Sequence, residues 1–231
     1  MRSVKTIFVK QANDMFKNMG TLIQFLIFPA VALLMTHLVA IPDADMPNNM
    51  FVTMKAAMFA GMALIPVMTG IIAEDVERKS LKLLVMAGVK PHQYLLGIGG
   101  FILLAGTVAA VAFSLMGDFA GIETVKFLTI LITGTAASII LGATIGIVAK
   151  NRQSATSISM PIAMVLGFAP MVANFNETIE RFSGILFTQQ INVIVNDFDA
   201  NFSGAMLIVG ANIAVLTVLF AIAYKKKGLR G

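Results

Sequence analysis

The sequence predicts an all-α, polytopic membrane protein with six transmembrane helices, because three of its features indicate that architecture. Hydrophobic residues make up 58% of the 231 residues, and charged residues only 13%. The apolar residues gather in runs of about twenty, each long enough to cross ~30 Å of hydrocarbon at ~1.5 Å per helical residue. The basic residues cluster between alternate runs, which is the pattern that orients a polytopic protein.

The chain divides into a surface segment and one membrane domain. Residues 1–19 alternate apolar and basic side chains at helical spacing, which predicts an interfacial amphipathic helix held by lipid; a frayed cytosolic tail is the alternative. Residues 20–231 form a single six-span domain. We expect its spans at residues 21–41, 51–73, 94–116, 125–149, 155–174 and 204–224.

Two features within the membrane domain predict how its helices pack and bend. Small residues recur every fourth position of the fourth expected span, at Gly134, Ser138, Gly142 and Gly146. Such a ridge lets helix backbones approach closely, and we expect it to pack inside the chain rather than between two chains. Prolines at positions 29, 66, 161 and 170 are candidate bending points.

The outer loops are predicted from their composition. Residues 175–203 interleave apolar and polar side chains, which predicts one or two short amphipathic helices that dip into the outer leaflet or cap a pore. The loop after the first span carries Asp43 and Asp45.

Six spans place both termini on one side of the membrane. Of the 17 Lys and Arg residues, all except Lys55, Lys126 and Arg181 fall on that side. The positive-inside rule then predicts that both termini, and the loop at residues 74–93, are cytoplasmic. The calculated pI of about 9.6 reflects these membrane-flanking charges, so no nucleic-acid partner is expected.

Several chemistries find no support in the sequence. The chain has no Cys and carries neither a phosphate-binding loop nor an H-E-x-x-H or G-x-S-x-G motif, so we expect no catalytic residue, metal site or cofactor on it. No charge is needed in the interior of any span, because Lys55 and Lys126 fall on the outer side. Intramembrane charges are the usual mark of carriers driven by an ion gradient, so their absence argues against such a carrier. If the protein does work, the energy must come from another chain.

The stretch Glu74–Gly97, EDVERKSLKLLVMAGVKPHQYLLG, carries many of the charges. It predicts a short amphipathic helix that Gly88 ends, with Pro91 opening the next helix. The expected shared face comprises Val76, Ser80, Leu83, Leu84 and Ala87. A basic and apolar helix between two spans suits docking on a soluble partner, and an ordinary solvated loop is the alternative.

This stretch resembles the cytoplasmic loop of type 2 (ABC-2-like) permeases of ABC transporters. In both, an acidic and basic run leads into a leucine-rich turn, a small residue, a proline and a leucine pair. The family commonly has Gly-Thr where this chain has Lys79-Ser80, and often an acid at Lys82. The resemblance implies that the coupling helix, which sits in a groove of the ATP-binding subunit, includes Glu74, Glu77, Arg78, Ser80, Leu81, Leu83 and Leu84.

The resemblance further implies a permease subunit of an exporter in a bacterial-type cytoplasmic membrane. Two permease subunits, identical or paralogous, would pair with two ATPase subunits that hold ATP and Mg. The apolar spans, rich in Met and Phe, favour a hydrophobic or amphipathic cargo such as a peptide, a lipid-like molecule or a drug. The alternatives are a non-transporting partner-binding or immunity protein, and a passive channel.

Overall fold

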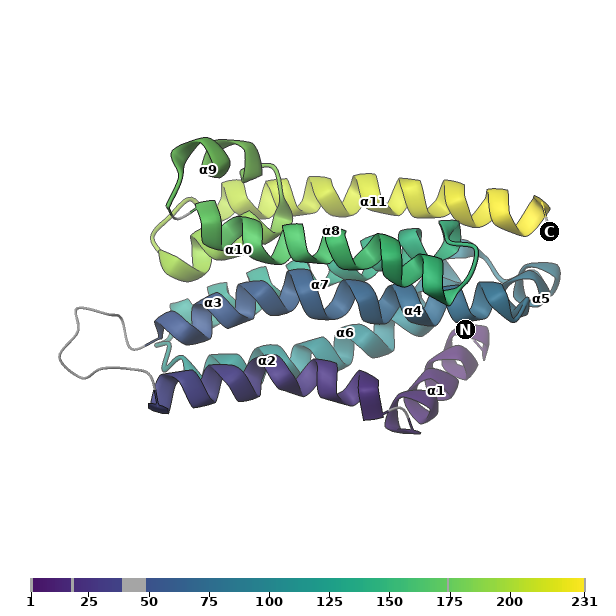
Figure 1. Ribbon diagram of the computed structural model, residues 1–231, viewed down its shortest axis with the longest axis horizontal. Helices are drawn as coiled ribbons and strands as arrows, with labels where there is room; N and C mark the ends of the chain where they lie inside the picture. The colour runs from purple at the N-terminus through teal and green to yellow at the C-terminus, as the bar shows by residue number, and fades with distance from the viewer. Residues whose placement is uncertain (1, 18, 39–48, 174, 231) are drawn as a thin grey trace.

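The computed structural model describes residues 2–17, 19–38, 49–173 and 175–230, and all regular structure in these ranges is helical (Figure 1). The elements in chain order are α1 (Arg2–Lys17), α2 (Met19–Leu38), α3 (Met50–Met58), the π-helical turn η1 (Phe59–Ala63), α4 (Leu64–Glu77), α5 (Ser80–Met86), α6 (Pro91–Met116), α7 (Ile122–Val148), α8 (Arg152–Ala173), α9 (Glu177–Ser183), α10 (Phe187–Asn196) and α11 (Phe202–Arg230).

The predicted fold class is confirmed. Six helices of the described residues are long and apolar enough to cross a membrane, and they are Met19–Leu38, Met50–Glu77, Pro91–Met116, Ile122–Val148, Arg152–Ala173 and Phe202–Lys227. The second runs about one turn further than expected, because the helix continues beyond its apolar run through Glu77. The end of the first expected span, at residues 39–41, and the loop with Asp43 and Asp45 lie outside the described residues.

The six helices form a bundle with two central members. The helix Met50–Glu77, built from α3, η1 and α4, and helix α7 are mostly buried, whereas α2 and α11 lie at the periphery. Both termini and α5 lie at one end of the bundle, which we call the terminal end, and α9 and α10 lie at the other (Figure 1). The termini therefore share a side of the molecule.

The small-residue ridge packs helices within the chain. A Cβ atom at Gly142 would lie 2.6 Å from the carbonyl oxygen of Ile65, and one at Gly146 would lie 2.8 Å from that of Thr69. The Ser138 hydroxyl donates to the Ala60 carbonyl oxygen. Only residues without a large side chain allow α7 to approach the central helix this closely. Gly134, the first member of the ridge in the chain, instead faces the side chain of Ile191 in α10.

The π-helical turn lies just before Pro66. Proline has no N–H group, so the carbonyl of Met62 loses its usual intrahelical donor, and a widened turn is one way in which a helix continues past such a position. Gly61 in this turn contacts the backbone of Gly167 in α8, where an added Cβ would lie 2.8 Å from the Gly167 nitrogen. Pro29 lies inside the continuous helix α2, as do Pro161 and Pro170 inside α8.

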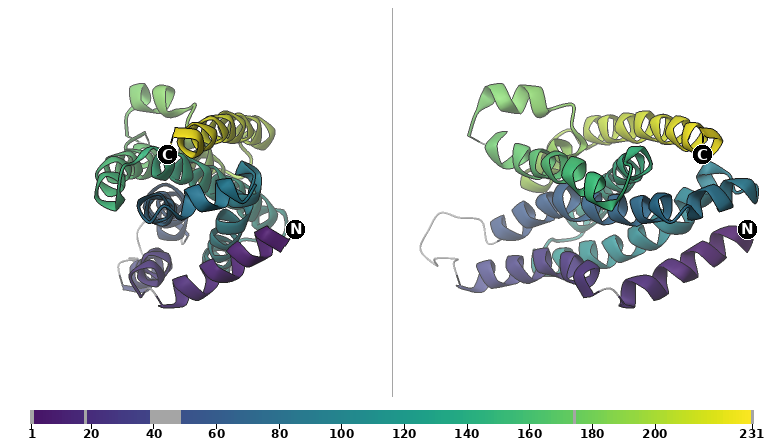
Figure 2. Two further views of the ribbon diagram at one scale, coloured as in Figure 1. Left: turned by 90° about the vertical axis from the view of Figure 1, so that its right-hand side faces the viewer. Right: turned by 45° about the vertical axis from the view of Figure 1, so that its right-hand side comes forward.

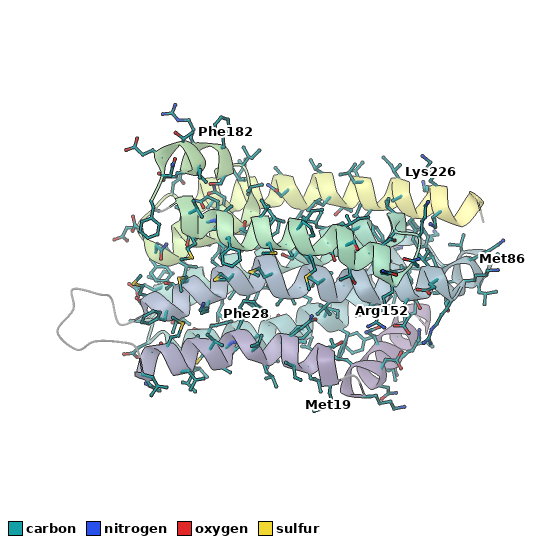
Figure 3. The ribbon with its side chains drawn as sticks, in the orientation of Figure 1. Met19, Phe28, Met86, Arg152, Phe182 and Lys226 are labelled. Atoms are coloured by element: carbon teal, nitrogen blue, oxygen red, sulfur yellow. The ribbon has the colours of Figure 1, made fainter. Side chains whose placement is uncertain are left out.

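The two segments expected to be surface helices differ in how they pack. In the outer loop, α10 buries Phe187, Ile191 and Ile194 inside the bundle, whereas α9 exposes Phe182 and projects from it (Figures 2 and 3). Helix α1 is inclined to the bundle axis and packs part of its apolar face on α6, because Gly97 leaves room for Ile7 (Figure 2).

Candidate functional site

The loop between the second and third spans forms two helices rather than the single amphipathic helix that the sequence predicts. Helix α4 continues through Glu77, and Lys79 then adopts a left-handed backbone with φ 58° before α5 begins at Ser80. A residue with a Cβ atom pays ~1–2 kcal/mol for this conformation. The turn lets Leu81 become buried, which offsets that cost because burying a leucine contributes ~1.5–3 kcal/mol.

The turn also splits the predicted shared face. Val76 and Leu84 pack against the core, whereas the side chain of Leu83 is 66% exposed. Met86, one helical turn further, is 73% exposed and lies at the extremity of the terminal end (Figure 3). Helix α5 therefore presents an apolar pair, Leu83 and Met86, at the tip of the molecule.

The surroundings of this pair are basic. Lys79 and Lys82 are exposed on the turn into α5 and on α5 itself, and Lys90 is exposed just beyond it. Leu83 and Met86 are three residues apart and so face the same side of the helix. A small apolar contact ringed by cations is the surface that α5 offers to the surroundings.

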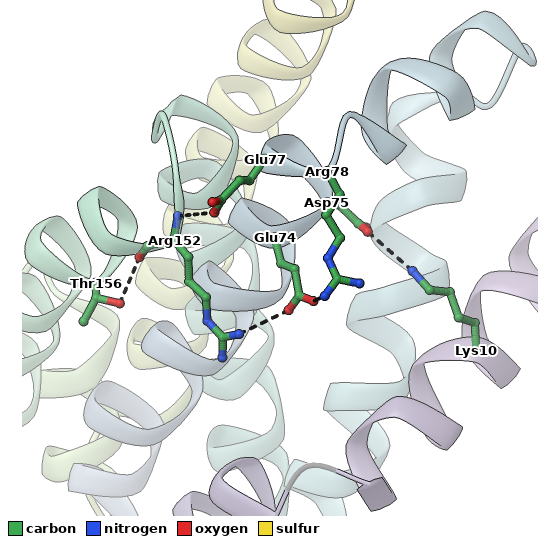
Figure 4. Close-up of polar contacts among 7 residues, drawn as sticks. All are labelled: Lys10, Glu74, Asp75, Glu77, Arg78, Arg152 and Thr156. Carbon is green, nitrogen blue, oxygen red and sulfur yellow. Dashed lines mark hydrogen bonds and ion pairs between the residues drawn. The ribbon is translucent and has the colours of Figure 1, made fainter.

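The acidic residues assigned to the coupling helix lie behind this surface and face α8 (Figure 4). One carboxylate oxygen of Glu74 lies 2.8 Å from Nη2 of Arg78, and the other lies 3.4 Å from Nη1 of Arg152. The Arg152 backbone N–H, at the start of α8, donates to the Glu77 carboxylate at 3.0 Å. The Glu77 carboxylate lies at the N-terminus of α8, where a negative charge is stabilised, and Glu74 pairs with the Arg152 side chain, so both residues link α8 to α4.

A second, buried cluster lies beside the first. Asp75 is only 7% exposed; one of its carboxylate oxygens accepts a hydrogen bond from the hydroxyl of Tyr94 in α6 at 2.8 Å, and the other lies 3.4 Å from Nζ of Lys10 in α1. The Tyr94 ring packs on that of Tyr224 in α11, with centroids 5.5 Å apart. The Tyr224 hydroxyl donates to the carbonyl of Val89, just after α5, at 3.0 Å. These contacts join α1, α4, α6 and α11 beneath α5.

The structure thus brings Glu74, Glu77 and Arg78 together and leaves Leu83 on a separate surface. Ser80 is half-buried, and Leu81 and Leu84 anchor α5 to the bundle. Sequence reasoning missed Arg152, Asp75 and Tyr94 as parts of this site. Asp75 had one signal, because it lies three residues after Ile72 and so shares its inward face.

No group of three or more His, Cys, Asp or Glu residues that could hold a metal ion occurs in the described parts of the chain. The terminal end combines an exposed apolar pair, Leu83 and Met86, with two charged clusters. One is the solvent-exposed Glu74 brace, formed by Glu74 and Glu77 with Arg152 of α8, and the other is the buried Asp75 cluster, which reaches three other helices. No protein-family model and no curated protein matches the chain.

Proposed function

We propose that this chain is the membrane-spanning permease subunit of an ATP-driven exporter of the ABC type, located in a bacterial-type cytoplasmic membrane. Two such subunits, identical or paralogous, would pair and bind two separate ATPase subunits that carry ATP and Mg. The observation that carries the proposal is the exposed Leu83 and Met86 pair on α5, at the terminal end of a six-span bundle. The resemblance of Glu74–Gly97 to the coupling loop of type 2 permeases supports it.

The geometry of the loop adds to this resemblance. Lys79 holds a left-handed backbone that glycine adopts without cost, and it stands where the resembling family commonly has glycine. A sharp turn at this position swings α5 out of line with α4. The partner best suited to the surface of α5 is a soluble subunit with an apolar groove for Leu83 and Met86 and an acidic rim for the nearby lysines.

The contacts behind α5 suggest how a partner's movement would reach the membrane helices. Force applied to α5 would pass through Val89 to Tyr224 of α11, and through the base of α4 to Arg152 of α8. The first route crosses the short connection after α5, where Val89 is buried and its carbonyl is hydrogen-bonded, and the second route runs through an ion pair. ATP-driven closure of the partner would then rock the spans between two access states, and cargo and nucleotide would influence each other reciprocally.

The cargo best suited to this bundle is hydrophobic or amphipathic, such as a peptide, a lipid-like molecule or a drug. Helix α8 leaves a row of apolar side chains exposed, three of them methionines, at Met160, Met164, Phe168 and Met171. Methionine adapts to irregular apolar shapes, so such a row would tolerate cargo of variable structure.

The test is co-purification of the ATPase with variants of the exposed pair. Leu83→Asp and Met86→Asp should each abolish recovery of a nucleotide-binding subunit from native membranes, together with ATP-dependent export. The matched control is Phe182→Asp, which changes an apolar residue that is 76% exposed on the short helix α9 at the opposite end. This control should retain the ATPase.

Two outcomes would overturn the proposal. The first is a wild-type complex that contains no ATPase subunit. The second is recovery of the ATPase with both α5 variants at the wild-type level, while gel filtration shows that the variants remain folded. A partner-binding protein without transport would instead retain some partner that lacks ATPase activity.

A further inference from the structure

A cavity of about 700 Å³ lies at the terminal end, between α1, the start of α2 and the end of α4. Its volume falls within the ~300–1,000 Å³ typical of small-molecule sites. Six charged residues line it, and they are Lys10, Asp14, Lys17, Glu74, Asp75 and Arg78. Met15 and Ile71 add a small apolar surface, so the lining combines charges of both signs with apolar side chains.

The charges in the cavity balance, with three cations and three carboxylates. Four of the six already take part in ion pairs, because Lys10 pairs with Asp75 and Arg78 with Glu74. Asp14 and Lys17 are both exposed, and neither forms an ion pair or hydrogen bond within the described part of the chain. They lie three residues apart on α1, so one unpaired anion and one unpaired cation face the same cavity.

A ligand that carries both charges matches this lining better than a ligand with one. A purely anionic headgroup would meet three carboxylates, and a purely cationic one would meet three cations, and like charges brought together at a site oppose binding. A phosphate could accept hydrogen bonds from Lys17 and Arg78, and a primary ammonium could donate to Asp14 and Glu74. A quaternary ammonium has no N–H to donate and prefers an aromatic cage, and the lining residues whose side chains the structure describes include no aromatic one.

The cavity opens onto a surface suited to acyl chains. Met19 lines the cavity and also begins α2, whose exposed residues Met19, Ile23, Leu26 and Ile27 follow the helical spacing i, i+4, i+7 and i+8. Only 11% of the apolar window of α2 is buried in the bundle. An apolar stripe therefore runs from the mouth of the cavity along the outside of a spanning helix, at the level where the predicted surface helix α1 meets the membrane.

We propose that this cavity binds a phospholipid with a zwitterionic, primary-amine headgroup, of the phosphoethanolamine type. The headgroup occupies the charged cavity between α1 and α4, and the acyl chains lie along the exposed stripe of α2. The bound lipid joins α1, α2 and α4 at the terminal end. Its binding does not depend on the proposed transport function, and it is measured on the chain without any ATPase.

The experiment is native mass spectrometry and lipid-dependent thermal unfolding of the purified chain in detergent. Phosphatidylethanolamine is compared with phosphatidylcholine, phosphatidylglycerol and the tail-free glycerophosphoethanolamine. We expect phosphatidylethanolamine to bind most tightly. The double variant Asp14→Asn/Lys17→Gln should bind it about tenfold more weakly or worse, because it removes two charge-assisted hydrogen bonds.

The matched control is Lys5→Gln, which removes an exposed cation of α1 that does not line the cavity and should leave binding unchanged. Asp14 and Lys17 are exposed, so their replacement should leave the helical circular dichroism intact. Equal binding of phosphatidylcholine or phosphatidylglycerol would overturn the headgroup assignment. Equal binding of glycerophosphoethanolamine would overturn the role of the acyl chains, and unchanged affinity of the double variant would place the lipid elsewhere.

Discussion

Replacing Gly142 with alanine should destabilise the bundle through one defined contact. The new Cβ atom would lie 2.6 Å from the carbonyl oxygen of Ile65 and 2.9 Å from Cβ of Met68. The first of these atoms belongs to the backbone and cannot rotate away. The Thr69 hydroxyl also donates to the Gly142 carbonyl at 3.0 Å, so a shift of α7 that relieves the clash strains this hydrogen bond.

The magnitude follows from two opposing effects. Overpacking a closed contact costs ~1–3 kcal/mol, whereas alanine favours a helix over glycine by ~0.5–1 kcal/mol. Gly70→Ala in α4 isolates the second effect, because an added Cβ there meets nothing within 4 Å. The difference in unfolding free energy between the two variants should therefore be about 1–3 kcal/mol, with Gly142→Ala the less stable.

The assay is unfolding of the purified chain by titration with SDS in mixed micelles, followed by far-ultraviolet circular dichroism, since the chain has no tryptophan. Gly210→Ala in the peripheral helix α11 provides a second open position, again with nothing within 4 Å of an added Cβ. If Gly142→Ala unfolds at the same SDS fraction as Gly70→Ala and Gly210→Ala, α7 does not pack against the central helix as described.

Three further predictions concern the terminal end. Tyr94→Phe leaves the buried Asp75 carboxylate without its hydroxyl donor and should lower the unfolding free energy by ~1.5–3 kcal/mol. Tyr224→Phe loses only a hydrogen bond to a neutral carbonyl and should cost less, so equal effects of the two variants in the SDS titration would contradict this prediction. Arg152→Gln breaks the solvent-exposed ion pair with Glu74 and should change the unfolding free energy by less than about 1 kcal/mol. A larger loss would show that this ion pair is essential for the stability of the bundle. Lys82→Cys, in a chain without other cysteines, should resist an impermeant maleimide in intact cells and react with it in inverted vesicles. Labelling in intact cells would show that this loop lies outside the cell, contrary to the predicted orientation.

The spans could be predicted because they depend on a one-dimensional property. A run of apolar residues either matches the thickness of the hydrocarbon layer or does not, and neighbouring chain segments do not alter that count. The small-residue ridge was equally visible, although its partners were not. Nothing local to Gly142 indicates that it faces the carbonyl of Ile65, because that contact depends on how two distant helices are placed.

The terminal end was predicted less well, because its geometry is set by tertiary contacts. The helical pattern of apolar residues continues past Glu77, and no local signal marks a left-handed residue at Lys79. The turn becomes favourable only when Leu81 finds a buried site. In the same way, Asp75 and Tyr94 are 19 residues apart in the chain and meet only because the fold brings the end of α4 next to the start of α6.

The two charged clusters differ in burial, and this difference indicates separate roles. The Glu74 brace is open to solvent, so its ion pairs add little stability and can break and reform as helices move. The Asp75 cluster is buried, so losing a partner there leaves an unsatisfied carboxylate, and the helices that it joins are expected to move together. A force on α5 would then carry α4, α6 and α11 as one body, and it would reach α8 through the ion pairs of Glu74, which can exchange as α8 adjusts its position. Helix α2 lies at the periphery and is mostly exposed, so its attachment at the terminal end would depend most on the membrane lipid beside it.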